Sequence, residues 1–323
     1  MGIIRWGVIG AGDIVVRRVA PAIVELDNCE FAAIARDRSE LAESSARELG
    51  AMRWYSDWRE MLADGEIEAV YIATPVHLHA EQSIAAARAG KHVLCEKPMA
   101  MNPGECDRMI EACEKHNVKL GVAYYRRFYP VLVRVRELLS SGEIGKPVIA
   151  QMNAFEYVDM SADGPRGWFL QRAKSGGGPM MDFGCHRLEV LLDLFGSVES
   201  VRGLTANVFF ERQVEDTAAA FLEFDSGTTA SVTVTHAARD PRDTLDIYGT
   251  EGSIRIPVLN NGTMNITTSQ GSREEQHPPH ENVHLPLISD FADAILNGRD
   301  AAVGGSAGRE VSKLIEEIYA DQQ

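Results

Sequence analysis

Short apolar runs alternate with longer segments of helical spacing over about the first 120 residues. The apolar runs lie at residues 3–9, 31–35, 70–73 and 92–95, and amphipathic or alanine-rich segments lie between them. Near-continuous apolar strands that alternate with helices are typical of a parallel sheet covered by helices on both faces. The pattern therefore predicts a mononucleotide-binding α/β domain over residues 1–122.

The rhythm changes near Pro147, where strand-like segments follow one another closely. Six strands are expected, at residues 148–157, 198–209, 216–224, 228–236, 244–248 and 253–257. The turn sequences Asp225-Ser226-Gly227 and Thr250-Glu251-Gly252 join two pairs of them, and strands joined by tight turns must be antiparallel. Residues 260–284 are interpreted as an exposed loop with one weak strand. We therefore expect residues 123–323 to form an α+β domain on a large, mostly antiparallel sheet.

Composition and charge exclude several classes of protein. The net charge of −15 argues against a nucleic-acid partner, because phosphate binding needs clustered lysine and arginine. No stretch approaches the roughly 20 apolar residues of a membrane helix, and the N-terminus lacks the pattern of a signal peptide. Five scattered cysteines without a CxxC pair favour free thiols in a reducing compartment. We therefore expect a cytoplasmic protein that has no membrane or nucleic-acid partner.

A glycine-rich turn follows the first predicted strand and opens a helix. Gly10 permits a tight turn, and Gly12 lets the backbone approach a pyrophosphate at the helix N-terminus, where Asp13 and Ile14 begin the helix. Val15 fills the third small position of the dinucleotide fingerprint, which departs from the usual pattern. A glycine-rich turn without a ligand is the alternative, but the strand before it and the helix after it favour a cofactor.

The second predicted strand ends in a charged tripeptide. An acid that binds the adenosine ribose is expected about twenty residues past the glycines, but Arg36 stands there, followed by Asp37 and Arg38. The two arginines can grip a 2′-phosphate, and Ser39 can add a hydroxyl donor. A shift of one residue would let Asp37 accept the ribose hydroxyl instead, and a solvated charged loop is a further alternative. We predict a slight preference for NADP over NAD.

Two later segments carry candidate acid–base chemistry. In Glu96-Lys97-Pro98 the lysine follows an apolar run, at the strand edge where open α/β sheets bind ligands. Its ammonium can stabilise a developing alkoxide there, although such a tripeptide is also common in surface turns. Further along, Asp182 and His186 follow three glycines and are expected to share one face of a helix that begins at Asp182. The alternative makes Asp182 an N-cap and His186 a core residue.

Together these motifs resemble the Gfo/Idh/MocA oxidoreductases, a family named for glucose–fructose oxidoreductase and inositol dehydrogenase. The resemblance rests on the glycine turn, Ala73-Thr74-Pro75 with His77 and His79, Glu96-Lys97-Pro98, and the segment from Gly176 to His186. It covers nearly the whole chain, with the motifs in matching order and spacing. It implies a Rossmann domain followed by an open-faced sheet domain, with NAD(P) tightly held.

The resemblance also implies roles for individual residues. The catalytic set would be Lys97, Asp182 and His186, with His186 as the acid/base. Thr74, Pro75, His79 and Glu96 would line the cofactor, as would Trp168, although Phe169 follows it where arginine is frequent. Tyr125 and Arg126 would lie near the substrate, with asparagine often in the place of Tyr125.

The remaining histidines do not predict a metal site. His77 and His79 lack a third ligand nearby in sequence, and His277, His280 and His284 lie without the cysteine or acid spacing of a zinc site. The sequence therefore predicts an NAD(P)-dependent dehydrogenase or reductase acting on CH–OH groups of a sugar, polyol or related hydroxy compound. A redox-neutral glycosidase or epimerase that retains its cofactor, and a non-catalytic NADP sensor, are the alternatives. We also expect a homodimer or homotetramer joined through the second-domain sheet.

Overall fold

The computed structural model describes residues 2–164 and 166–321, which form two compact units. The first unit holds residues up to Tyr125 together with His280–Ser312, and the second holds Arg126–Pro279 with the residues from Lys313 onward. The sequence predicts one boundary, between residues 122 and 123. In the structure, the segment His280–Ser312 also belongs to the first unit, so that unit is built from two stretches of chain.

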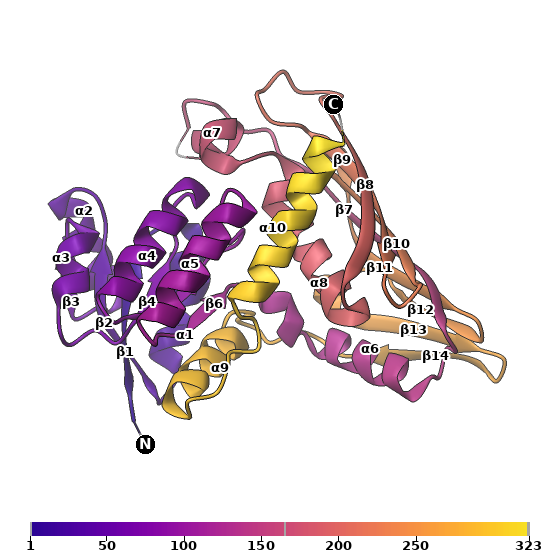
Figure 1. The fold of residues 1–323 in the computed structure, drawn as a ribbon, viewed down its shortest axis with the longest axis horizontal. Coiled ribbons are helices and arrows are strands. Elements are labelled where there is room, and N and C mark those ends of the chain that lie inside the picture. Colours follow the sequence, from indigo (N-terminus) through magenta and orange to yellow (C-terminus); the bar gives the residue numbers. More distant parts are fainter. Residues whose placement is uncertain (1, 165, 322–323) are drawn as a thin grey trace. The chain divides into compact units, whose positions relative to one another are not determined.

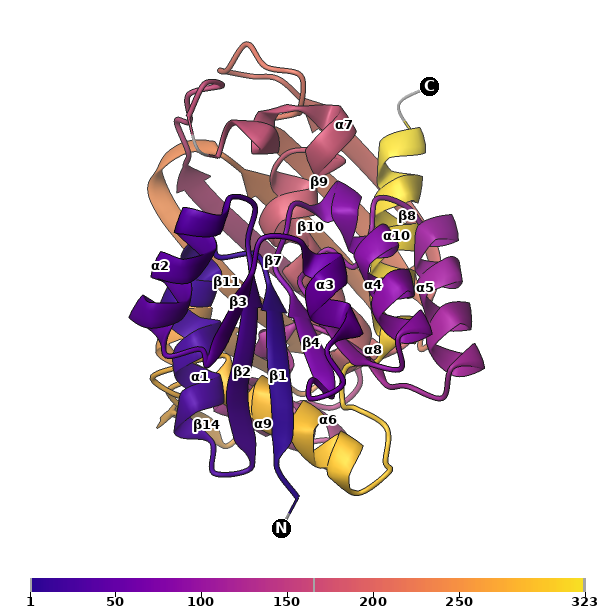
Figure 2. The ribbon, with the colours of Figure 1, turned by 90° about the vertical axis from the view of Figure 1, so that its left-hand side faces the viewer.

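The first unit is organised around a six-stranded parallel sheet, as the apolar pattern predicts. Its strands are β1 (Ile4–Ile9), β2 (Cys29–Ala35), β3 (Arg53–Tyr55), β4 (Ala69–Ile72), β5 (His92–Cys95) and β6 (Leu120–Val122). They lie in the order β3-β2-β1-β4-β5-β6, and Figure 2 shows β3, β2, β1 and β4 side by side. The chain runs outward from β1 and then crosses to β4, so the switch point, where such sheets bind ligands, lies between these two strands.

Helices of this unit come from both of its stretches. The earlier ones are α1 (Ala20–Glu25), α2 (Ser39–Leu49), α3 (Trp58–Ala63), α4 (His79–Arg88) and α5 (Pro103–Lys115). From the late stretch come α9 (Leu285–Leu296) and the first part of α10 (Gly305–Ala320). Phe291 of α9 packs its ring 5.9 Å from that of Trp6 in β1, and both side chains are buried. The late stretch therefore contributes to the core beneath the sheet.

The second unit contains an eight-stranded sheet, visible in Figure 1. Its strands are β7 (Pro147–Tyr157), β8 (Val198–Ala206), β9 (Thr217–Phe224), β10 (Thr229–Thr235), β11 (Ala237–Gly249), β12 (Gly252–Ile256), β13 (Thr263–Thr268) and β14 (Gly271–Gln276). Their order is β14-β13-β12-β11-β7-β10-β9-β8, and every pair is antiparallel except β10 with β7. The predicted mostly antiparallel sheet and both predicted hairpins are therefore confirmed.

The two faces of this sheet differ in burial. On β10, Ala230, Val232 and Val234 are fully buried, whereas the alternate positions are half-buried threonine and serine. Helix α6 (Pro130–Ser141) and helix α8 (Cys185–Phe195) belong to the same unit, and Phe195 of α8 packs its ring 5.4 Å from that of Phe224 in β9. On the opposite face the pleat places Phe221 beside Ser231, and that phenyl ring is 43% exposed. One face is therefore a core, and the other is open within a single chain.

Three strand predictions were wrong in their extent, and in one of them the strand expected at 244–248, β11, begins at Ala237. Residues 260–284 contain a hairpin of two strands, β13 and β14, rather than one weak strand. Strand β14 is almost entirely polar and lies at the sheet edge, so main-chain pairing holds it without an apolar pattern for the sequence to display. Strand β8 ends at Ala206 and not at 209, because the Asp216 carboxylate accepts hydrogen bonds from the N–H groups of Val208, Phe209 and Phe210 and draws that segment into a loop.

Candidate active site

The glycine turn after β1 has the two properties that a dinucleotide requires. Gly10 adopts φ +101°, and a Cβ there would lie 2.8 Å from the carbonyl oxygen of Ala73, which follows β4. The loops after β1 and β4 thus touch at the switch point, and only glycine fits. At Gly12, by contrast, a Cβ would meet no described atom within 4 Å. The protein itself leaves that surface open, which suits the close approach of a pyrophosphate.

The helix that follows begins with a wide turn. Asp13 and Ile14 open it, and residues Val15–Val19 form a π-helix in which the N–H of Ala20 donates to the Val15 carbonyl. Single π-turns inside helices occur frequently at functional sites. Val15 is fully buried, so the bulky side chain at the third fingerprint position is accommodated in the core, away from the open surface at Gly12.

The charged loop after β2 is only partly ordered by side-chain contacts. Arg36 is half-buried, and its guanidinium donates to the hydroxyl of Ser45 on α2 at 3.1 Å. Arg38 occupies the N-cap position of α2 with φ 69°, and both Arg38 and Asp37 are exposed. The loop thus offers one anchored and one exposed guanidinium at the start of a helix, where anions are favoured.

A buried histidine joins two of the predicted cofactor loops. His79 is 1% exposed; its Nδ1 lies 3.0 Å from the Pro98 carbonyl oxygen and its Nε2 lies 2.8 Å from that of Thr74. Burial lowers its pKa, and the hydrogen bonds to Thr74 and Pro98 oppose that shift. His79 therefore holds the Thr74-Pro75 loop against the Glu96-Lys97-Pro98 loop, while its direct contact with a cofactor stays a prediction.

Glu96 lies at the centre of a buried polar cluster behind Lys97. Tyr71 on β4 donates a 2.6 Å hydrogen bond to Oε1 of Glu96, and Nε2 of His284 lies 3.6 Å from the same oxygen. Burial alone would raise the pKa of Glu96, but His284, Lys97 and Tyr71 together hold it below its ordinary value. The other oxygen, Oε2, accepts the main-chain N–H of Lys97 at 3.1 Å. The carboxylate thus fixes the backbone that carries the lysine.

Tyr125 is half-buried and packs its ring against the buried His284, with the ring centroids 4.7 Å apart. His284 comes from the late stretch of this unit, just before α9. Sequence reasoning considered it only as a metal ligand and missed this contact, because nothing local to His284 indicates that it reaches the Glu96 loop.

In the second unit, a buried glutamate anchors the glycine run that leads to Asp182. Glu215 is 1% exposed and accepts hydrogen bonds from the main-chain N–H groups of Gly178 at 2.8 Å and Met180 at 3.3 Å, and from the hydroxyl of Tyr319 at 2.8 Å. A Cβ at Gly178 would lie 1.9 Å from the Glu215 carbonyl oxygen. These glycines therefore permit close packing of the segment on Glu215.

Asp182 lies inside a second π-turn, Met180–Gly184, directly before α8. Its main-chain N–H donates to the Gly178 carbonyl, and the turn has already begun at Met180, so Asp182 neither starts the helix nor caps it. His186 follows in the first turn of α8 and is 3% exposed. The four-residue spacing keeps both side chains on nearly the same side of the backbone.

Two residues beside Asp182 were not predicted as part of the site. Nε2 of the buried His236, which follows β10, lies 3.4 Å from Oδ2 of Asp182. On the other side of the ring, Arg212 donates to Nδ1 at 3.0 Å. A lone histidine after a strand and a lone arginine in a loop carry no sequence signal, because 54 and 30 residues separate them from Asp182.

Arg126 is buried in an ion-pair cluster of the second unit. Its guanidinium lies 3.3 Å from Asp243 on β11 and donates to Asn260 at 3.0 Å, while Arg187 of α8 contacts the other oxygen of Asp243 at 2.5 Å. Arg126 therefore ties its segment to the sheet, and a contact with substrate stays a prediction. Trp168 is half-buried, and its ring stacks on that of Phe169 with the centroids 3.9 Å apart. Its contact with a cofactor likewise stays a prediction.

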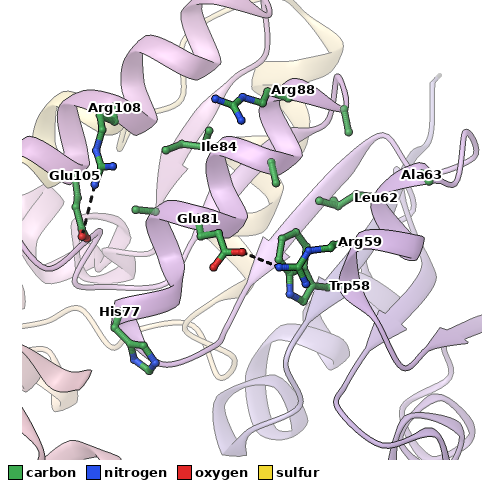
Figure 3. A pocket seen from close by; sticks show the side chains of 13 residues that line it. Trp58, Arg59, Leu62, Ala63, His77, Glu81, Ile84, Arg88, Glu105 and Arg108 are labelled. Carbon is green, nitrogen blue, oxygen red and sulfur yellow. Dashed lines mark hydrogen bonds and ion pairs between the residues drawn. The ribbon is translucent and has the colours of Figure 1, made fainter. Parts of the chain in front are cut away.

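A separate hollow of about 800 Å³ lies along the flanks of α3, α4 and α5, as Figure 3 shows. Arg59 there stacks 4.1 Å over Trp58 and pairs with Glu81 at 2.8 Å, and Arg108 lies 3.7 Å from Glu105. These charges largely satisfy one another, and most of the lining residues come from helix flanks rather than from the strand ends. The hollow is thus distinct from the predicted cofactor loops.

Within residues 2–164 and 166–321, no three His, Cys, Asp or Glu side chains gather closely enough to hold a metal ion. The helices of that part of the chain include none with the length and apolar character needed to cross a membrane.

Comparison with known proteins assigns the chain to a family. Residues 4–124 match the model of an oxidoreductase family with an NAD-binding Rossmann fold, and residues 132–255 match the GFO/IDH/MocA C-terminal domain. A D-xylose 1-dehydrogenase (NADP(+)) from Haloferax volcanii is 35% identical over 97% of this chain and 96% of its own. The scyllo-inositol 2-dehydrogenase (NAD(+)) of Bacillus subtilis is 29% identical over 93% and 88%.

Solved structures agree with this assignment. Levoglucosan dehydrogenase, in complex with NADH and levoglucosan, superposes with a TM-score of 0.90 at 26% identity, covering 98% of this chain and 96% of that one. The match extends over both units of the chain, and the family was already indicated by the motifs. This chain therefore belongs to the GFO/IDH/MocA family of oxidoreductases.

Proposed function

We propose that this protein oxidises a carbinol carbon of a sugar, polyol or related hydroxy compound, or reduces the corresponding carbonyl, with NAD(P). The observation that carries the proposal is the close spacing of Asp182, half-buried in the π-turn before α8, and His186, buried in the first turn of α8, in a chain of this family that also keeps Lys97. The relatives named above act, by their names, on xylose, inositol and levoglucosan. Their shared chemistry supports a polyhydroxylated substrate.

Each of the three residues has a distinct role in the proposed reaction. His186 removes the hydroxyl proton during oxidation and returns it during reduction, since an imidazole titrates near neutral pH. Lys97 hydrogen-bonds the same substrate oxygen and stabilises the alkoxide, with its backbone held by Glu96. Asp182 orients the substrate by accepting a hydroxyl hydrogen bond. The nicotinamide supplies or accepts the hydride when it is bound.

Residues of the first unit would hold the cofactor. The open surface at Gly12 suits the pyrophosphate, and Thr74, Pro75 and Glu96 line the adjoining strand ends. We infer a preference for NADP over NAD from Arg36 and Arg38, because a guanidinium pairs well with a 2′-phosphate. The acid that follows β2, Asp37, is exposed. The Trp168 contact is part of the same proposal.

We also infer the assembly and compartment of the protein. The open face of the second-unit sheet carries exposed apolar side chains, among them Leu204 at 72% and Phe221 at 43%, which supports a homo-oligomer joined through that face. All five cysteines are free thiols, four of them buried, which is consistent with a reducing cytoplasm.

A cofactor-reduction screen across sugars, inositols and their acids tests the proposal. On the substrate so found, His186→Asn should fold and bind NAD(P) but lose at least about a hundredfold in kcat, the typical scale of general acid–base catalysis. Lys97→Met should show a loss of similar size. His116→Asn is the matched control, since it makes the same chemical change at an exposed position at the end of α5.

The outcomes separate the proposal from its rivals. Near-normal turnover by His186→Asn would show that this histidine is structural. Product formed without net change in the cofactor would favour a redox-neutral glycosidase or epimerase. Binding of NADP without any conversion of substrate, in a screen broad enough to include the relatives' substrates, would favour a sensor.

A further inference from the structure

His236 occupies a position that no assigned role explains. It follows β10, is 2% exposed, and has a defined neighbour on each side of its ring. Nε2 lies 3.4 Å from Oδ2 of Asp182, Nδ1 lies 3.0 Å from the Arg212 guanidinium, and the ring of Phe183 packs edge-on at 4.9 Å. The histidine thus lies between a half-buried cation and the carboxylate of the proposed active site.

The arginine determines where the proton of His236 sits. A guanidinium has only hydrogen-bond donors, so Nδ1 must accept from Arg212 with its lone pair. The ring proton therefore lies on Nε2, which faces Asp182. Which nitrogen carries the proton follows here from the chemistry of the partner and needs no observation of hydrogen atoms.

Arg212 also opposes a second proton on the ring. An imidazolium would place an N–H against the guanidinium N–H groups and one positive charge 3.0 Å from another. Arg212 cannot easily move away, since it donates to the Glu215 carbonyl at 3.2 Å and stacks 4.8 Å from the ring centroid of Phe210. Burial lowers the pKa of Arg212, and Asp216 and Glu215 oppose that shift and favour its charged form.

The charged groups around His236 come from two elements. The π-turn before α8 contributes Asp182, and the loop before β9 contributes Arg212 with Glu215 and Asp216 beyond it. The main-chain N–H of His236 donates to the Asp216 carbonyl at 2.7 Å, so the backbone is fixed as well. In the part of the chain that the structure describes, Asp182 is thus the one acid recorded in direct contact with the imidazole.

We propose that Arg212 and His236 are positioning residues, which present a fixed Nε2–H to Asp182 and hold that carboxylate oriented for the substrate. The proposal rests on the proposed function for the role of Asp182 toward substrate, but the fixed tautomer follows from the contacts alone. It gives the two buried histidines different tasks. His236 directs its Nε2–H toward the Asp182 carboxylate, 3.4 Å away, whereas His186 exchanges the proton of the reaction.

The tautomer is tested directly by NMR on the intact protein with ¹⁵N-labelled histidine. His236 is assigned from the signals that disappear in His236→Gln. We expect Nε2 to be protonated and Nδ1 to be bare, because Nδ1 accepts from Arg212. A proton on Nδ1 would overturn the proposal whether or not the protein proves to be a sugar oxidoreductase.

Variants then test the coupling to Asp182. Arg212→Met removes the donors that fix the tautomer, so the Nδ1 and Nε2 signals of His236 should change in the same spectra, and kcat should fall. His236→Leu removes the donor to Asp182 and should lower kcat about ten- to a hundredfold, on the scale of a misplaced catalytic group. His236→Gln can direct an N–H to the same carboxylate and should restore most of that loss.

Three results would contradict the positioning role. His236→Leu could retain normal kcat and KM across the pH range, Arg212→Met could leave the histidine spectrum unchanged, or His236→Gln could be no better than His236→Leu. Circular dichroism and cofactor binding of each variant verify folding, and the spectrum of the unaltered protein decides the tautomer even if a variant fails to fold.

Discussion

A single buried carboxylate, that of Glu215, anchors the glycine-rich segment before Asp182, and its removal should be measurable in stability and in turnover. Glu215 accepts three hydrogen bonds, two from the main chain of the segment before Asp182 and one from Tyr319. We consider Glu215→Gln, which keeps the size of the side chain, with Tyr319→Phe as the matched control that removes one of the three bonds.

The magnitude follows from which donors a glutamine can satisfy. Its oxygen can face Gly178, and its NH₂ can donate to the Tyr319 hydroxyl, which then reverses its role. The N–H of Met180, now 3.3 Å from Oε1, would lose its acceptor in a buried place. A buried unsatisfied donor costs about 1–3 kcal/mol, and bonds to charged groups contribute about 1.5–3 kcal/mol against about 1 for neutral ones. Glu215→Gln should therefore lower the free energy of unfolding by about 2–4 kcal/mol.

Tyr319→Phe should lower the free energy of unfolding by less, about 1–2 kcal/mol, because the Glu215 carboxylate keeps both of its main-chain donors. Urea unfolding followed by fluorescence and far-UV circular dichroism measures both variants against the unaltered protein. Turnover should fall in Glu215→Gln more than in Tyr319→Phe, since only the former loosens the main chain four residues or fewer before Asp182. Equal loss of stability in the two variants, or normal turnover in Glu215→Gln, would refute the anchoring role.

Four further predictions follow from other parts of the chain. Gly10→Ala should destabilise the protein by at least about 1–2 kcal/mol in thermal unfolding, because alanine is strained at φ +101° and would meet the Ala73 carbonyl. Gly12→Ala should fold normally, and fluorescence titration should show that it binds the cofactor about tenfold or more weakly. Arg36→Ala should weaken the binding of NADP by about 1.5–3 kcal/mol and leave the binding of NAD unchanged. If the unaltered protein bound NAD as tightly as NADP or more tightly, the inferred cofactor preference would be reversed. Burial, opposed by Arg127, raises the pKa of Glu189 from 4.5 to about 7. Folding therefore favours the neutral form of Glu189. As pH rises from 4.5 to 7, the free energy of unfolding should fall by about 3 kcal/mol relative to that of Glu189→Gln. A difference between their melting curves that does not depend on pH would contradict this. Light scattering should show a multiple of 35.5 kDa that Phe221→Asp reduces, and a single 35.5 kDa species at micromolar concentration would exclude the oligomer.

Much of the fold is readable in the sequence because it is local. The apolar runs at β1, β2, β4 and β5 are buried on both faces, and the alternation in β10 displays its one buried face. The turn residues at 225–227 and 250–252 fix two hairpins through their own backbone preferences. Strand β14 could not be read in this way, because its polar side chains bury nothing and only its main chain pairs.

The chemical groups were also readable, but their surroundings were not. Lys97, Asp182 and His186 stand in motifs whose order along the chain identifies the family. That Glu96 holds the backbone of Lys97 while Tyr71 and His284 hold Glu96 depends on a contact across 188 residues of chain, from Glu96 to His284. The Arg212–His236–Asp182 contacts depend on the folding of a loop and a strand end onto a π-turn.

The strands and helices with clear periodicity, and the motifs expected to hold a dinucleotide and a proton-transfer group, could be recognised from the sequence alone. The folded chain was needed to see that the glycines before Asp182 pack closely on Glu215, that Asp182 is not a helix cap, and that His79 is enclosed between two loops. The physical reason is that hydrogen bonding, burial and tautomer depend on neighbours in space. Residues far apart in the chain become such neighbours only when the sheets form.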